Sequence, residues 1–135
     1  MRKIALLLLV ALSLLLVACT PEETSHALGV NAFRQANGVA PLGWDDSLST
    51  KARAWSQHMA DDGKLSHSDL KVGAPAGWQI LGENVAMNSD VNAALTALEN
   101  SPAHRDNLLN GRFTRGAVGI VQAKGVYWVT EEFVG

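Results

Sequence analysis

The sequence predicts an α+β domain in which helices pack on a small antiparallel sheet. Two observations lead to this prediction. Apolar residues recur at helical spacing through the first half of the chain, and the last twenty residues form an apolar, β-branched hairpin pattern. The composition, with 47% hydrophobic and 18% charged residues, is globular, and a length of 135 residues favours one folded domain.

The first 18 residues have the layout of a secretory signal peptide. Met1-Arg2-Lys3 is a basic start, and Ile4 to Val17 is an apolar run interrupted only by Ser13. This run is shorter than the roughly 20 residues that span the hydrocarbon of a bilayer comfortably. We therefore expect residues 1–18 to be a signal peptide and the rest of the chain to lie outside the cytoplasm.

Cys19 is the only cysteine and follows this segment directly, in Leu16-Val17-Ala18-Cys19. These four residues resemble a bacterial lipobox. The resemblance implies cleavage before Cys19, diacylglycerol on its sulfur and anchoring to a bacterial membrane as a lipoprotein. The alternative is a chance cysteine after an ordinary cleavage site. With lipidation, residues 19–25 are expected to be a lipidated tether and residues 26–135 the folded domain.

Charge and cysteine content exclude two classes of protein. Removing Arg2 and Lys3 leaves 9 Lys and Arg against 13 Asp and Glu, and the basic residues never cluster, so no nucleic acid is expected as a partner. A single cysteine forms no disulfide within the chain, so the domain depends on its core for stability.

Two amphipathic helices are predicted in the first half of the domain. The first is capped at Thr24 or Ser25 and ends at Asn37-Gly38. The second starts near Asp45 and ends at Gly63. Apolar side chains at helical spacing define the buried faces: Ala27, Val30, Phe33 and Ala36 in the first helix, and Leu48, Ala52, Trp55 and Met59 in the second.

Two further helices and three strands are predicted in the second half. A helix is expected over Val91 to Leu98, and Ser101-Pro102 starts a short one, with serine as N-cap and proline at the first helical position. Ala117 to Val121 and Val126 to Val134 form a hairpin around Lys124-Gly125, and Asn84 to Ala86 is the third strand.

Leu81-Gly82-Glu83-Asn84-Val85-Ala86 places a carboxylate inside an otherwise small and apolar run. A charge in such surroundings must reach solvent or find a partner. His67, in a polar loop, and His104, near the start of the short helix, are the candidate partners. His104 lies where the helix dipole keeps an imidazole neutral and available as a ligand. His67 alone could equally cap a backbone carbonyl. We predict that Glu83 and both histidines line one polar pocket.

These residues form an ordered set of motifs that resembles a known family. In chain order they are Asn31 with Arg34, Leu42 before Trp44, the alanine-rich helix ending in Met59, Ser66-His67-Ser68, Gly82-Glu83-Asn84-Val85-Ala86, Ser101-Pro102-Ala103-His104-Arg105-Asp106-Asn107-Leu108-Leu109, Phe113-Thr114 before Gly116-Ala117-Val118-Gly119, and Tyr127-Trp128-Val129. The set resembles the bacterial branch of the CAP superfamily (cysteine-rich secretory proteins, antigen 5, pathogenesis-related), also called SCP-like extracellular proteins.

The resemblance implies a three-layer α-β-α sandwich around a small antiparallel sheet, with a cleft that sometimes holds zinc or another divalent cation. By this resemblance His67, Glu83 and His104 are the metal-binding candidates, and Asn84 and Arg115 join them in the ligand cleft. Where bacterial relatives often follow Phe-Thr with glutamate, this chain has Arg115. A guanidinium near the pocket would repel a cation.

Two functions are compatible with this sequence. The first is a cell-envelope binding module whose cleft recognises a lipid, a cell-wall component or a protein. The second is a metal-assisted hydrolase acting on peptides, esters or the cell wall, with Glu83 as general base and His67 or His104 positioning water or a metal. The sequence has no Gly-x-Ser-x-Gly elbow and no His-Glu-x-x-His helix, which favours the binding module.

Overall fold

The computed structural model describes residues 19–135, and the predicted signal peptide over residues 1–18 lies outside the described part. The elements in chain order are α1 (Pro21–Ala36), β1 (Gly43–Trp44), α2 (Asp46–Asp62), β2 (Leu81–Asn88), α3 (Val91–Asn100), α4 (Pro102–Leu108), β3 (Arg115–Ala123) and β4 (Val126–Val134). Within residues 19–135, no helix combines the length and the hydrophobicity needed to cross a bilayer.

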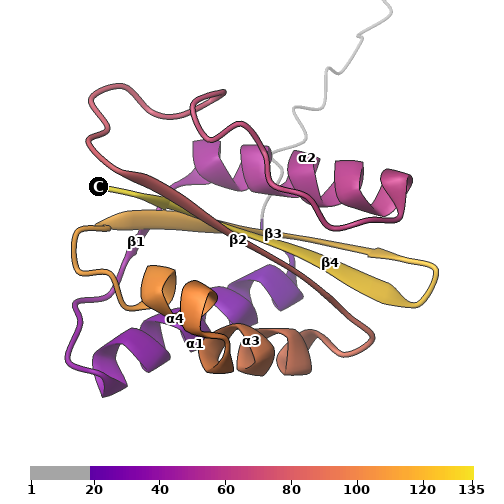
Figure 1. Ribbon diagram of the computed structural model, residues 1–135, viewed down its shortest axis with the longest axis horizontal. Coiled ribbons are helices and arrows are strands. Elements are labelled where there is room, and N and C mark those ends of the chain that lie inside the picture. The colour runs from indigo at the N-terminus through magenta and orange to yellow at the C-terminus, as the bar shows by residue number, and fades with distance from the viewer. Residues whose placement is uncertain (1–18) are drawn as a thin grey trace, which may run out of the picture.

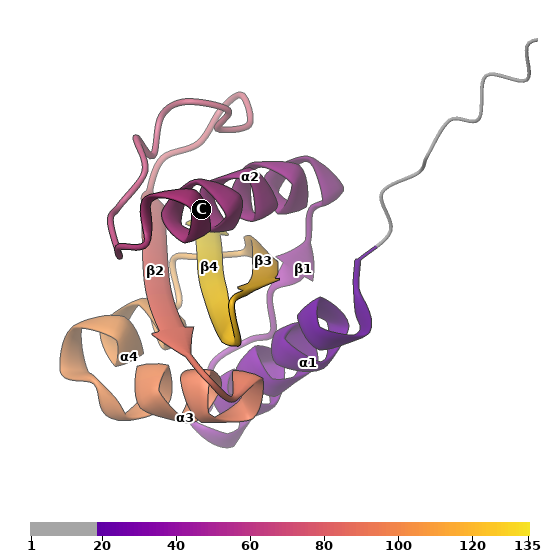
Figure 2. The same cartoon turned by 90° about the vertical axis from the view of Figure 1, so that its right-hand side faces the viewer.

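The four strands form one sheet in the order β1-β3-β4-β2. β4 pairs with both β2 and β3 in antiparallel fashion, and the two-residue β1 adds a parallel pair to β3 that the sequence did not predict. Helix α2 covers one face of the sheet, whereas α1, α3 and α4 cover the other (Figures 1 and 2). The predicted α+β, three-layer α-β-α architecture is therefore confirmed.

The predicted hairpin is present and longer than expected. Its turn residues Lys124 and Gly125 have φ angles of 52° and 76°. Positive φ at both central positions is the geometry of a type I′ turn, whose twist matches that of the flanking strands. β3 and β4 thus pair along their whole length and form the centre of the sheet.

Helix α1 begins earlier than predicted. Its N-cap is Thr20 rather than Thr24 or Ser25, because the Thr20 side chain accepts from the Glu23 backbone N–H while the Glu23 side chain accepts from the Thr20 N–H. This reciprocal pair is a capping box, and Pro21 follows at the first helical position. Most of the segment expected to be a tether, residues 19–25, is therefore helical.

The buried face of α1 is more polar than its apolar spacing predicted. Val30 is buried as expected, but Glu23, His26 and Arg34 are buried beside it. The Arg34 guanidinium donates to four backbone carbonyls, those of Ala40, Leu108, Asn110 and Phe113. A buried charge needs such partners. These hydrogen bonds link α1 to the connector that follows it and to the segment at and after the end of α4.

Helix α2 agrees closely with its predicted start, end and buried face. Asp45 caps it, Gly63 ends it in the left-handed conformation, and Leu48, Ala52 and Met59 are buried. The helix lies so close to β3 that a Cβ atom added at Gly119 would meet the backbone N of Arg53 at 2.1 Å. The hydroxyl of Ser56 donates to the Gly119 carbonyl across this contact. Only glycine permits this approach of helix and strand.

Replacing Gly119 with alanine should destabilise the fold, because the new methyl group overlaps backbone atoms that have no room to move. We expect Gly119→Ala to lower the free energy of unfolding, measured by urea titration, by about 1–3 kcal/mol. Gly111→Ala is the matched control, since a Cβ there meets nothing within 4 Å. Equal stability of the two variants would contradict the close contact.

Candidate functional site

Two glutamates face each other across β2 and β4 on the side of the sheet that α2 covers. Glu83 on β2 is in register with Glu132 on β4. The backbones of Ile80 and Gly135 exchange both hydrogen bonds, so the pair three positions along each strand, Glu83 and Glu132, belongs to the non-hydrogen-bonded set. Side chains in such pairs come closest together. Both glutamates are buried, with exposed fractions of 5% and 3%.

Glu83 is held by the loop that follows α2. The ring Nδ1 of His67 lies 2.8 Å from Glu83 Oε1, and the Ser68 backbone N–H donates to the same oxygen at 3.0 Å. The Ser68 hydroxyl donates to Oε2. The predicted pairing of His67 with Glu83 is therefore present, and both oxygens of this buried carboxylate accept hydrogen bonds.

Glu132 is the acid of this site whose pKa is clearly raised. Burial, the neighbouring charge of Glu83 and a hydrogen bond to Glu83 together raise the pKa of Glu132 to about 8, and Lys51 opposes this only in part. The Lys51 ammonium lies 3.2 Å from Glu132 Oε1. Glu132 therefore holds its proton at neutral pH and serves as donor to Glu83. We call these five residues, Lys51, His67, Ser68, Glu83 and Glu132, the Glu83 centre.

A surface groove of about 420 Å³ adjoins the Glu83 centre, between α2 and residues 68–72. Its volume lies within the range of small-molecule sites. Trp55 and His58 of α2 stack in it with ring centroids 4.4 Å apart, and Val72 opposite them is 67% exposed. Ser68, which holds Glu83, and Lys51, which lies beside Glu132, both line the groove, so the groove and the buried centre share two residues. We call this feature the α2–loop groove.

His104 lies in α4, on the opposite side of the sheet from the Glu83 centre (Figure 2). Its ring Nδ1 is 2.8 Å from the Ser101 hydroxyl, so Ser101 does not cap the helix with its side chain as predicted. The prediction that both histidines and Glu83 line one pocket is therefore wrong for His104. The reason is the sheet itself, which separates the α4 layer from the α2 layer.

Asn84 also faces the α4 side, since successive strand residues point to opposite faces. Its amide nitrogen donates to the His104 carbonyl and to the Glu131 carboxylate, and its oxygen accepts from Asn107. Glu131 in turn lies 2.7 Å from His26 Nε2. Asn84 belongs to a buried network that joins β2 and β4 to α1 and α4, and not to the expected ligand cleft.

Arg115 does not join the Glu83 centre either. It starts β3, and its Nη1 lies 3.1 Å from Asp45 Oδ2 at the beginning of α2. The hydrogen bond from Ser47 is the largest cause of the lowered pKa of Asp45; burial opposes it, and Leu48, Ser47 and Arg115 add to the lowering. The expected repulsion between Arg115 and a bound cation is therefore not a feature of this site.

The described residues do not fit the divalent cation that the family resemblance implied. Among residues 19–135, no group of three or more His, Cys, Asp or Glu side chains is placed to hold a metal ion. The predicted ligand His104 lies across the sheet, and the Lys51 ammonium lies beside the second carboxylate instead. His67 and Glu83 remain together but are joined by a hydrogen bond to each other.

Sequence reasoning missed Glu132 and Lys51. The signal for Glu132 was the pair Glu131-Glu132 inside a strand that is otherwise apolar and aromatic. Adjacent residues on a central strand point to both covered faces, so each acid had to be buried. Lys51 gave no such signal, because it lies beside the apolar stripe of α2 like any exposed lysine.

The fold and the buried carboxylate centre define a small three-layer α-β-α domain. Residues 29–133 match the family model described as "CAP: Cysteine-rich secretory protein family". The chain belongs to the CAP family.

The protein is similar to several bacterial proteins. It is 37% identical over 114 residues to the Bacillus subtilis protein YkwD, which is described as uncharacterized, covering 78% of this chain and 44% of that one. It superposes on an extracellular SCP-domain protein of Bacillus anthracis with a TM-score of 0.74 and 29% identity, covering 87% of this chain and 44% of that one. The chain thus spans less than half the length of either relative.

A third similarity concerns the fold alone. An outer surface protein of Borrelia burgdorferi superposes with a TM-score of 0.76 at 16% identity, covering 87% of this chain and 95% of that one. That protein consists almost entirely of the same domain, so the three-layer fold also occurs without the additional length found in the Bacillus relatives.

The proton on Glu132 should make the stability of the protein depend on pH. The folded state keeps this proton up to pH of about 8, whereas the unfolded chain releases it near its ordinary pKa of 4.5. The free energy of unfolding should therefore fall as pH rises between these values, by at most about 1.4 kcal/mol per pH unit, and level off above pH 8.

Glu132→Gln should remove most of this slope, because an amide also donates to Glu83 but does not titrate. Urea titrations from pH 5 to pH 9 measure the effect. The control Glu22→Gln replaces an exposed glutamate of α1 and should keep the wild-type slope. A wild-type slope in Glu132→Gln would show that Glu132 does not carry the proton.

Proposed function

We propose that the protein is a membrane-anchored, extracytoplasmic binding module that takes its ligand in the α2–loop groove. The observation that carries this proposal is the open groove that adjoins the buried carboxylate centre and shares Lys51 and Ser68 with it. Trp55, His58 and Val72 offer apolar and aromatic surface, and Ser68 connects this surface to Glu83. A lipid, a cell-wall component or a protein segment are the candidate ligands.

Binding is favoured over hydrolysis by the state of the two glutamates. A general base must have a free lone pair within reach of water. Both oxygens of Glu83 instead accept hydrogen bonds from His67 and Ser68, and Glu132 is protonated and buried. The Glu83 centre therefore supports the loop that forms one wall of the groove rather than a chemical step.

The location outside the cytoplasm is supported by the relatives and by the sequence. The Bacillus anthracis relative is described as extracellular, and it is 29% identical to this chain. The segment before Cys19 has the layout of a signal peptide, and Leu16-Val17-Ala18-Cys19 resembles a lipobox. Both point to export followed by attachment to a membrane.

The attachment requires two reactions on Cys19. The thiol attacks the glyceryl carbon of a glycerophospholipid donor, an Sγ–C bond replaces the Sγ–H bond, and the phosphate headgroup leaves with the proton. Water then cleaves the peptide bond between Ala18 and Cys19. Cys19 is exposed, as the first reaction requires.

Val72→Glu tests the α2–loop groove. Val72 is 67% exposed, so the change should leave the fold intact while placing a charge among the apolar groups of the groove. Binding of the unlipidated protein from Cys19 onward to purified peptidoglycan and to phospholipid vesicles is measured by co-sedimentation in detergent-free buffer. We expect at least a tenfold loss of affinity for the probe that the wild type binds.

Met87→Glu is the control for this experiment, because Met87 is an exposed apolar residue at the β2 edge, outside the groove. Unchanged binding by Val72→Glu would refute the groove as the binding site. Release of soluble fragments from peptidoglycan by the wild type, abolished in Glu83→Gln, would support the hydrolase instead.

Cys19→Ala tests the anchor. The diacylglyceryl group is attached through the thiol of Cys19, the only cysteine of the sequence, so the variant should move from the membrane fraction to the soluble extracytoplasmic fraction. Mass spectrometry of the wild-type amino-terminal peptide should show the diacylglyceryl group. A variant that stays in the membrane fraction would refute lipid anchoring through Cys19.

A further inference from the structure

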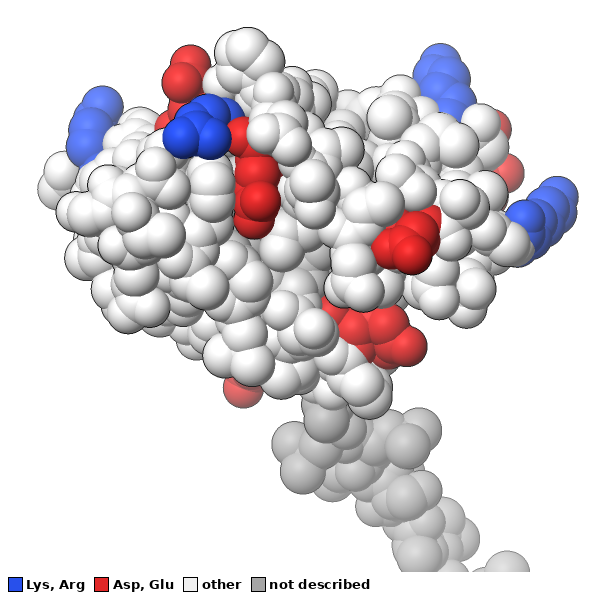
Figure 3. Space-filling view, turned by 90° about the horizontal axis from the view of Figure 1, so that it is seen from below, with Lys and Arg blue, Asp and Glu red and all other residues white. Residues whose placement is uncertain are grey.

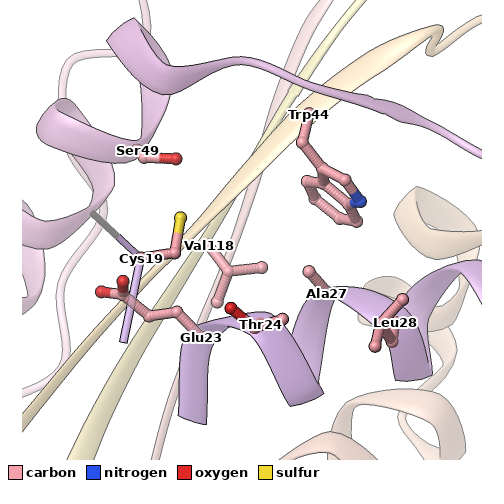
Figure 4. A pocket seen from close by; sticks show the side chains of 8 residues that line it. All are labelled: Cys19, Glu23, Thr24, Ala27, Leu28, Trp44, Ser49 and Val118. Atoms are coloured by element: carbon pink, nitrogen blue, oxygen red, sulfur yellow. The ribbon is translucent and has the colours of Figure 1, made fainter. Parts of the chain in front are cut away.

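A second pocket, of about 140 Å³, lies where the described chain begins, between α1, β1, β3 and the start of α2. Ala27 and Leu28 of α1, Trp44 of β1 and Val118 of β3 line it, and Cys19 closes it on one side. Figure 4 shows the Cys19 sulfur directed into the space between Ser49 and Val118. The only residue predicted to carry a lipid therefore borders an apolar pocket.

The rim of this pocket is an exposed apolar surface. Leu28 is 65% exposed and Trp44 is 39% exposed, although both are large hydrophobic side chains. Figure 4 shows them together at the end of the pocket away from Cys19. Exposed apolar groups gathered in one place mark a surface that meets a partner or a membrane, and tryptophan is frequent where a protein meets the bilayer interface.

The charges near the start of the described chain do not favour attachment to anionic lipids. On the one face that Figure 3 shows, the visible Lys and Arg side chains lie toward the rim, while acidic groups lie closer to the start of the described chain. A basic patch would be needed for attraction to anionic lipids. Apolar contact is therefore the interaction that this side can make with a bilayer.

The chain leaves little length between Cys19 and the folded domain. Thr20 is already the N-cap of α1, and its capping box fixes the backbone directly after Cys19. The rest of the chain, residues 1–18, ends at this same place. A lipid on Cys19 consequently starts next to the pocket rather than at the end of a long linker.

We infer that this pocket receives the glyceryl part of the lipid on Cys19, so that the side carrying Leu28 and Trp44 rests on the bilayer. The pocket, of about 140 Å³, has room for a three-carbon glyceryl group but not for two long acyl chains. The chains therefore leave past Leu28 and Trp44 into the membrane. This inference rests on the proposed lipidation and adds a fixed orientation of the domain.

Quenching of tryptophan fluorescence by brominated lipids tests the orientation. The full-length protein is produced in a bacterial host that lipidates it, purified and reconstituted into phosphatidylcholine vesicles with bromine near the headgroup end of the acyl chains. The wild type should be quenched relative to unbrominated vesicles. Trp44→Phe should lose at least half of this quenching, whereas Trp78→Phe, a change at a similarly exposed tryptophan outside both pockets, should retain it.

A second variant tests the same surface without changing a tryptophan, so that a folding defect in Trp44→Phe does not decide the result. Leu28→Glu places a charge on an exposed position and should reduce the quenching of Trp44 at least twofold. Met87→Glu, which changes another exposed apolar side chain away from this pocket, should not reduce it. Quenching that is unchanged by both Trp44→Phe and Leu28→Glu in a lipidated, vesicle-bound protein would overturn the orientation alone. A wild-type protein that carries no diacylglyceryl group would overturn both the proposed lipidation and the proposed binding of the glyceryl group in this pocket.

Discussion

Two adjacent register positions of β2 and β4 place four polar residues inside the molecule. Glu83 and Glu132 face α2, and Asn84 and Glu131 face the α1, α3 and α4 layer. Burying a carboxyl group without partners costs several kcal/mol, so each layer must supply groups that satisfy these side chains. The positions of His26 and of the loop after α2 follow from this requirement.

The same requirement separates two roles that lie on opposite faces of the sheet. On the α1 side, the network around Asn84 and Glu131 connects buried side chains to partly buried residues of α4 and fixes the helices to the strands. On the α2 side, the partners of Glu83 come from a loop, and one of them, Ser68, also lines the α2–loop groove. The proposed binding surface is thus supported by the buried carboxyl pair, which stays covered.

The sequence predicted the parts of the fold that repeat a local pattern. The stripe of α2 and the hairpin around Gly125 were found because their spacing and turn residues are visible within a few positions. The start of α1 was misplaced, since its Thr20 cap lies directly after the expected cleavage site. The pairing of His67 with Glu83 was found, but His104 was placed on the wrong side, because a linear sequence does not show which face of the sheet a helix covers.

The four hydrogen bonds of Arg34 have a consequence for the order in which the protein folds. The guanidinium near the start of the domain donates to carbonyls as distant as that of Phe113, 79 residues further along the chain. Contacts of such sequence separation form late, since the intervening segment must be closed first. The amino-terminal helix therefore lacks these four hydrogen bonds until the chain as far as Phe113 is available to accept them.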